Sequence, residues 1–188
     1  MPSCARPLKL ALLLAGLLFV PANVQAGDFA AQIESAQLVY AGGDYTLQAQ
    51  IDYRLSPMAK EALHKGVALH WNVLFELREP GWPWDSQALH RQLPYSLQFH
   101  ALLNQYVVQS PHSRSEMFLS LSAALKFMAS AHDTTPVPAT LLAAGKTYTL
   151  AVKAQFNREL LPIPLRPVAY LDPRWFLSSP WQTWPIQK

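Results

Sequence analysis

Residues 67–77, with the sequence VALHWNVLFEL, decide the fold predicted for this chain. Every second residue of this stretch, from the first valine to the last leucine, is apolar. Because a β-strand places alternate side chains on one face, these apolar residues form a continuous face. The other face mixes apolar with polar side chains, among them His70, Asn72 and Glu76. The pattern is typical of a central strand in an antiparallel sheet with one face on the core.

Two other segments, residues 45–53 and 148–156, show the same alternation of apolar and polar side chains. The first follows Gly42 and Gly43, and paired glycines supply the positive φ angles that tight hairpin turns need. Residues 31–40 precede the glycines and are predicted to pair with residues 45–53. The clearest local prediction is therefore a β-hairpin with one buried, apolar face and one face exposed to solvent.

Two short helices are expected between strands. Ser56 followed by Pro57 predicts a helix over residues 58–65, because serine caps a helix and proline fits its first position. The exposed side of this helix carries polar side chains and is expected to face solvent. A second helix is predicted from Ser120, as the capping residue, to about Ala131, after a short strand that ends at Leu119.

The remaining segments are extended or irregular in our interpretation. We expect a strand over residues 93–99, with Pro94 limiting its beginning to an edge or a bulge, and a neighbouring strand at 104–109. The other expectations are a loop at 133–138, a polyproline-like connector at 160–167, and final strands at 168–171 and 175–177.

About seven short strands separated by turn signals predict a mainly β fold, an antiparallel immunoglobulin-like β-sandwich with two short helices. A β-barrel is the alternative. Residues 27–188 are expected to form this single domain, since about 162 residues can bury a core that is stable without disulfide bonds. The one cysteine, Cys4, precedes the domain, so no disulfide is expected in it.

Residues 1–26 have the pattern of a secretory signal peptide. Arg6 and Lys9 form a basic start, Leu10–Val20 is an apolar run, and small residues precede Gly27. The run is shorter than the roughly 20 residues that span a bilayer. We expect cleavage before Gly27 and a periplasmic location. An uncleaved segment that anchors the domain at the inner membrane is the alternative.

The charge balance gives no sign of a nucleic-acid partner. The formal net charge of the whole chain is +3, but Arg6 and Lys9 belong to the predicted signal peptide, which holds no acidic residue. The chain from Gly27 onward therefore has a net charge of +1. Its basic residues form no cluster of the kind that binds phosphate backbones. Glycine-rich phosphate loops are also absent from the sequence, so we expect no nucleotide and no other cofactor.

Six histidines raise the question of a metal or catalytic site. Their spacing includes no H-x-H and no H-E-x-x-H pattern, so we predict no metal site and no catalytic residues. Ser178 and Ser179, between tryptophan and proline, are more typical of hydroxyls that bond to the backbone than of activated nucleophiles. The alternative function is a periplasmic hydrolase whose site is assembled from dispersed residues such as His90, His100 or Ser179.

Tryptophan is the feature that most favours a binding role. A loop at residues 79–85 carries two tryptophans, and loops usually lie on the surface. Tryptophan buries a large area at little entropic cost and anchors many interfaces. The candidate binding residues, including three near the end of the chain, are Trp82, Trp84, Trp175, Trp181 and Trp184. In the alternative interpretation the tryptophans cover an open edge or end of the sandwich.

Three segments resemble a known family of exported proteobacterial proteins: residues 148–150, 161–166 (LPIPLR) and 175–181 (WFLSSPW). The family is catalogued as domain-of-unknown-function family 4390, and the resemblance covers about residues 31–184. It implies a single domain in the envelope of a Gram-negative bacterium, and it implies no reaction. Genes of this family often lie near a membrane sensor kinase, which associates the family with envelope signalling.

Together these observations predict an exported, non-enzymatic binding module. Its expected partner is another envelope or inner-membrane protein, and an accessory role in envelope signalling fits the resemblance. Contact with the membrane itself is expected only if the signal segment is uncleaved.

Overall fold

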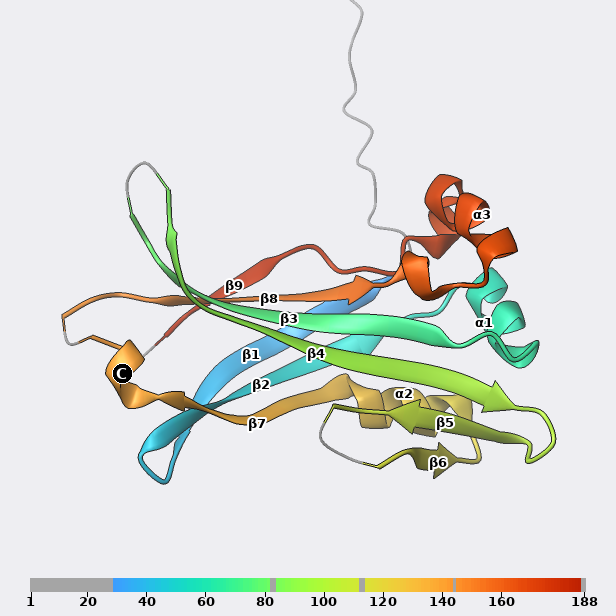
Figure 1. Cartoon of the computed structure of the whole chain (residues 1–188), viewed down its shortest axis with the longest axis horizontal. Helices are drawn as coiled ribbons and strands as arrows, with labels where there is room; N and C mark the ends of the chain where they lie inside the picture. The colour runs from blue at the N-terminus through green and yellow to red at the C-terminus, as the bar shows by residue number, and fades with distance from the viewer. Residues whose placement is uncertain (1–28, 82–83, 112–113, 144, 187–188) are drawn as a thin grey trace, which may run out of the picture.

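The computed structural model describes residues 29–81, 84–111, 114–143 and 145–186 (Figure 1). These residues form a mainly β structure of two antiparallel sheets that lie one above the other, with helices at one end. The predicted signal peptide, Trp82 and His112 lie outside the described residues. None of the helices in the described ranges is long and apolar enough to cross a membrane.

The smaller sheet contains the predicted hairpin. β1 (Ala31–Ala41) and β2 (Asp44–Tyr53) pair antiparallel, and β7 (Ser130–Pro138) pairs with the other edge of β2. Gly42 and Gly43 have φ angles of 63° and 102°, which a residue with a Cβ rarely adopts. The hairpin and its turn are thus confirmed.

The larger sheet is built around the stretch that opened the sequence analysis. β3 (Leu69–Glu79) pairs with β4 on one side and β8 on the other, all antiparallel. The order of strands is β6 (Glu116–Phe118), β5 (Gln105–Gln109), β4 (Ser86–His100), β3, β8 (Thr149–Phe156) and β9 (Gln182–Pro185). The predicted central position of β3 is confirmed.

Both predicted helices form with the predicted caps. Ser56 Oγ accepts a hydrogen bond from the backbone N–H of Ala59 at 3.1 Å and begins α1 (Pro57–His64). Ser120 Oγ accepts from Ala123 N–H at 3.2 Å and begins α2 (Leu121–Ala129). α1 does not simply face solvent, because His64 Nε2 lies 2.8 Å from the hydroxyl of Tyr106 on β5. The remaining helical elements of the described chain are η1 (Ala139–Leu141), η2 (Arg158–Leu160), η3 (Ile163–Leu165), α3 (Arg166–Leu171) and η4 (Pro173–Trp175).

The core lies between the two sheets. The alternate residues of β3 that face it are all buried: Leu69, Trp71, Val73, Phe75 and Leu77. Trp71 is the largest of them, and its ring packs against those of Tyr53 from the smaller sheet and Phe156 on β8, with centroids 5.4 and 5.1 Å away. One apolar interior therefore joins both sheets.

The predicted loop at residues 133–138 is wrong, because these residues belong to β7. Asp and Pro are depleted in strands, which is why the sequence suggested a loop. β7 is an edge strand of the smaller sheet, and edge positions tolerate proline. The buried side chains of Ala131 and Val137 fix it to the core.

The position predicted for Pro94 is also wrong in part. Pro94 lies in the middle of β4, opposite Asn72, and not at its beginning. The described part of β5 pairs with β4 only from Ser96 onward. Pro94 therefore lies in a stretch of β4 that pairs with a strand on one side only, which is the kind of edge position that proline tolerates. The strand itself begins eight residues earlier, at Ser86.

The tail differs most from the prediction. The expected extended connector at residues 160–167 and the strands at 168–171 and 175–177 are replaced by the compact turns η3, α3 and η4. Proline fits the first turn of each, because a helix start leaves its first N–H groups unbonded. The last strand is β9, which the sequence analysis missed.

The immunoglobulin-like arrangement is not confirmed by these strand orders and stays a prediction. A closed barrel is excluded for the described strands, because they form two separate sheets. The fold thus established is mainly β, with two antiparallel sheets and three α-helices in the described chain.

Trp71 provides the test of this core. Its indole N–H donates to the carbonyl of Leu177 at 3.3 Å while its ring fills the space between the sheets. Trp71→Ala should lower the free energy of unfolding by about 3–5 kcal/mol because it leaves a cavity. Trp71→Phe should cost roughly 1–3 kcal/mol because it removes the hydrogen bond and part of the ring. Urea denaturation followed by circular dichroism measures both, and Trp84→Phe at an exposed site is the control. A loss below about 1 kcal/mol for Trp71→Ala contradicts this role.

Candidate functional site

The hairpin tip between β3 and β4 presents the most exposed tryptophan of the described chain. Trp84 is 81% exposed, in the loop just before β4. In Figure 1 the β3–β4 hairpin extends away from the other strands at the end opposite the helices. The end of β3 next to the tip is tied to the loop before β8 by an ion pair between Glu79 and Lys146, with 2.7 Å between Oε1 and Nζ. Trp82, the other candidate of this loop, lies outside the described residues.

Trp181 lies on the face of the larger sheet that points away from the core. The guanidinium carbon of Arg78 is 5.0 Å from its ring centroid, and Lys153 Nζ is 5.8 Å away. Cations at this distance attract the face of an indole ring. Trp181 is half-buried, so one part of the ring is still accessible.

The other two C-terminal tryptophans belong more to the body of the protein. Trp175 is 1% exposed, stacks on Phe156 and donates its indole N–H to Met58 Sδ at 2.9 Å. Trp184 on β9 lies opposite Leu150, is half-buried and packs against the core. Trp175 thus has no accessible ring surface and serves as a core residue beneath the helical end.

The residues named for a hydrolase do not form a common site. His90 and His100 lie at positions of β4 that are ten residues apart, which is about 33 Å in a strand. His90 Nδ1 is 3.5 Å from Glu76 Oε1. Ser179 is buried, and its hydroxyl accepts a hydrogen bond from Ala154 N–H at 2.9 Å.

The hydroxyls of Ser178 and Ser179 hold the tail to β8. Ser178 Oγ accepts from Phe156 N–H at 2.9 Å, two residues along from the bond to Ser179. Ser179 N–H also donates to the carbonyl of Ala154 at 2.8 Å. The prediction that these hydroxyls bond to the backbone is confirmed.

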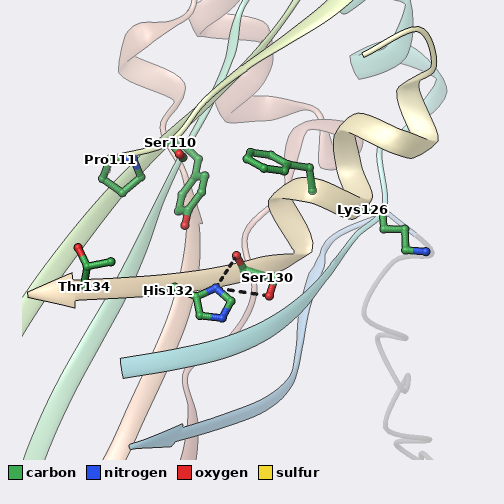
Figure 2. A pocket seen from close by; sticks show the side chains of 8 residues that line it. Ser110, Pro111, Lys126, Ser130, His132 and Thr134 are labelled. Atoms are coloured by element: carbon green, nitrogen blue, oxygen red, sulfur yellow. Dashed lines mark hydrogen bonds between the residues drawn. The ribbon is translucent and has the colours of Figure 1, made fainter. Parts of the chain in front are cut away.

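Figure 2 shows a groove of about 400 Å³ at the side of the sandwich, between β4, α2 and β7. Its apolar wall is formed by Tyr95, Pro111 and Phe127, and its described polar lining residues are Ser110, Lys126, Ser130, His132 and Thr134. His132 Nδ1 is 3.5 Å from Ser130 Oγ and 3.3 Å from Ser130 O. None of the described lining residues is a carboxylate, so this serine and histidine have no acidic partner within the lining. Sequence spacing alone gave no signal for this groove, because its residues come from four separate segments.

No metal centre is assembled by the part of the chain that the structure describes: no three His, Cys, Asp or Glu side chains lie close enough to hold an ion. The polar groups that are buried serve the fold. Asp133, for example, is 2% exposed, and its Oδ1 accepts from Thr135 N–H at 2.9 Å. The geometry offers surfaces and a groove for binding.

A second surface, missed from the sequence, lies on the helical end. Residues 158–176, from η2 to the residue after η4, are called the C-terminal cap below. Its exposed large apolar side chains are Leu160, Ile163, Val168, Tyr170, Leu171 and Phe176. The sequence suggested extended structure for the cap. Which of its residues are exposed depends on the helical turns that form there, so this surface could not be predicted.

Fold and surfaces define a class of protein: a two-sheet antiparallel β domain with exposed aromatic and apolar surfaces at both ends. Residues 29–185 match the family model described as "Domain of unknown function (DUF4390)", and the chain therefore belongs to this family. The resemblance noted in the sequence is thus confirmed. No curated protein and no solved structure matches the chain.

Tyr95 in the groove gives a pH-dependent prediction. Burial raises the pKa of Tyr95 to about 12, the Asp133 carboxylate adds to the rise, and a hydrogen bond with the His132 backbone opposes it. Burial also raises the pKa of Tyr53. An unfolded tyrosine ionises near pH 10, so above this pH the unfolded state binds fewer protons than the folded state.

The free energy of unfolding should therefore be unaffected by these tyrosines below about pH 10 and should fall as the pH rises towards about 12. Tyr95→Phe should make this fall shallower, because one of the two contributions is removed. Urea denaturation at a series of pH values from 8 to about 11.5 measures the slope. An identical slope in Tyr95→Phe and the unchanged protein contradicts the role of Tyr95.

Proposed function

We propose that this protein is an exported envelope protein that works by binding another envelope or inner-membrane protein through the β3–β4 hairpin tip. The observation that carries the proposal is the 81% exposure of Trp84 at the tip. A large ring left in water favours burial against a partner, and tryptophan is enriched among residues that dominate binding energy. The proposed contacts are Trp82 and Trp84, with the accessible part of Trp181 and with Trp184 as flanking positions.

The shape of the hairpin supports this role. β3 and β4 are paired as far as Glu79 and Ser86, so the tip is carried by a ladder of backbone hydrogen bonds. A loop on such a scaffold loses little conformational entropy when it binds. Immunoglobulin-like sandwiches also bind through the loops at their ends, and we propose that this domain has the immunoglobulin-like arrangement.

The proposed location is the periplasm, supported by the signal-peptide pattern of residues 1–26. N-terminal sequencing of the exported protein tests it: a chain that begins at Gly27 supports cleavage, and an earlier start supports an anchored form. The proposed role in signalling is accessory and rests on the association of the family with sensor-kinase genes. The hydrolase alternative has no observation that favours it over binding.

Trp84→Ala tests the binding surface. In-cell crosslinking and affinity recovery of the protein should yield a partner whose amount falls by about tenfold or more in the variant, the usual loss when a central aromatic contact is removed. Leu102→Ala is the matched control, because Leu102 is fully exposed in the turn at the other end of β4.

Both variants should unfold at the same urea concentration as the unchanged protein, because neither side chain is buried. A partner recovered in equal amount with Trp84→Ala and with Leu102→Ala contradicts the proposal. The same experiment with Trp82→Ala shows whether the second tryptophan of the tip takes part.

A further inference from the structure

The C-terminal cap concentrates exposed apolar side chains on one short segment. Six large ones lie between residues 160 and 176, and Leu171 and Ile163 are the most exposed at 82% and 74%. Single exposed apolar residues are ordinary on a protein surface, whereas a group of them marks an interaction site. The cap holds six of the fifteen large apolar side chains that are exposed in the described chain.

The cap is held firmly, so its outward residues are presented on a fixed surface. Leu161, Ala169 and Trp175 point inward and are buried. Arg166 Nε donates to the carbonyl of Leu161 at 2.8 Å, and Leu165 N–H donates to the carbonyl of Pro162 at 2.9 Å. Buried side chains alternate with exposed ones along the cap. The backbone is therefore fixed, and the exposed side chains are held at the surface.

Charged residues of both signs lie among the apolar side chains of the cap: three arginines, together with Glu159, which accepts a hydrogen bond from the Tyr170 hydroxyl, and Asp172, which pairs with Arg174. The guanidinium carbon of Arg158 is 4.7 Å from the ring centroid of Phe176 and 5.4 Å from that of Tyr170. Arg166 and Ile163 line a shallow groove of about 560 Å³ together with Lys65, the residue after α1, whose Nζ also pairs with Glu61 Oε1 at 2.6 Å. With three arginines and two acidic residues, the cap has a net charge of +1. A net positive charge beside exposed apolar side chains favours the interface of an anionic bilayer.

The chain enters the sandwich next to the cap. Ala31 N–H donates to the carbonyl of Leu177 at 3.1 Å, directly after the last cap residue. In the sequence, only residues 21–28 separate the apolar run Leu10–Val20 from Phe29. A linker of that length reaches at most about 30 Å. In the alternative form, in which the segment stays attached as an anchor, this short linker keeps the point where the chain enters the sandwich, and with it the neighbouring cap, close to the membrane.

We propose that the C-terminal cap docks on a lipid bilayer with anionic headgroups, with Ile163, Leu171 and Phe176 in the interface and Arg158, Arg166 and Lys65 near the phosphates. The apolar patch supplies the insertion and the basic side chains supply the charge complementarity. This surface is separate from the hairpin tip, and its test needs no protein partner.

A fluorescent label at a single cysteine tests the docking directly. In a Cys4→Ser background the chain has no other cysteine, so Leu171→Cys in the cap and Leu102→Cys as the matched control each carry one polarity-sensitive dye. The exported protein is mixed with phosphatidylcholine vesicles with and without phosphatidylglycerol. We expect a blue shift at position 171 with the anionic vesicles, a smaller one at high salt, and none at position 102.

Co-sedimentation with the same vesicles gives the magnitude. The double variant Ile163→Ser/Leu171→Ser should reduce the vesicle-bound fraction by about tenfold or more, since two exposed side chains lose their burial in the interface. Leu102→Ser/Leu119→Ser, with two leucines that are also exposed, should bind as the unchanged protein does.

Equal dye responses at positions 171 and 102 overturn the proposal, and so does a loss of crosslinks to a protein in the cap variant without a change in vesicle binding. In the second case the cap binds a protein and not lipid. Trp84→Ala should keep its vesicle binding, so failure of one proposal is distinguishable from failure of the other.

Discussion

The carbonyl of Leu177 is the point on which the arrangement of the whole structure depends. It accepts hydrogen bonds from the indole N–H of Trp71 at 3.3 Å and from the backbone N–H of Ala31 at 3.1 Å. One donor belongs to the larger sheet and the other to the smaller sheet, so a single tail residue joins both. Leu177 itself is buried, where a polar group without partners costs about 1–3 kcal/mol. With both donors present, the tail can cross the end of the core.

This junction also fixes the C-terminal cap and the strand that follows it. The hydroxyls of Ser178 and Ser179 bond to the backbone of β8 directly after Leu177, and β9 then pairs with β8. On the other side of Leu177, the buried ring of Trp175 stacks on Phe156. These contacts hold the C-terminal end of the cap, and at its other end Asn157 N–H donates to the carbonyl of His70 on β3 at 2.8 Å. Both ends of the cap are thus attached to the larger sheet or the core, which explains how four short helical turns keep a defined shape.

The sequence predicted those parts of the fold whose residues alternate with a period of two or begin with a capping serine. β1, β2, β3, β8 and both caps follow from local patterns, because burial of one strand face needs a regular spacing. β7 could not be predicted, since its place at the edge of β2 comes from pairing between residues 80 to 94 positions apart. The tail was predicted wrongly for a related reason: prolines that indicate extended chain also fit the first turn of a helix, and only the burial of Leu161, Ala169 and Trp175 selects the compact form.

Among the candidate tryptophans, the loop position of Trp84 could be predicted from the proline and glycine nearby. The core position of Trp175 depends on contact with Met58, which no local pattern shows.

β3 gives the two proposed surfaces a physical connection. It begins just after α1, which packs on the turn η4 of the cap, and it ends at the hairpin tip. Eleven residues of strand span about 35 Å, so the tip and the cap lie at opposite ends of one rigid element (Figure 1). A domain that rests on a bilayer through its cap would thus hold Trp84 roughly that far from the lipid surface. At such a height the tip can meet the folded part of a membrane-bound protein, and it cannot meet the bilayer itself. The two surfaces therefore do not compete, because the central strand separates them by its own length.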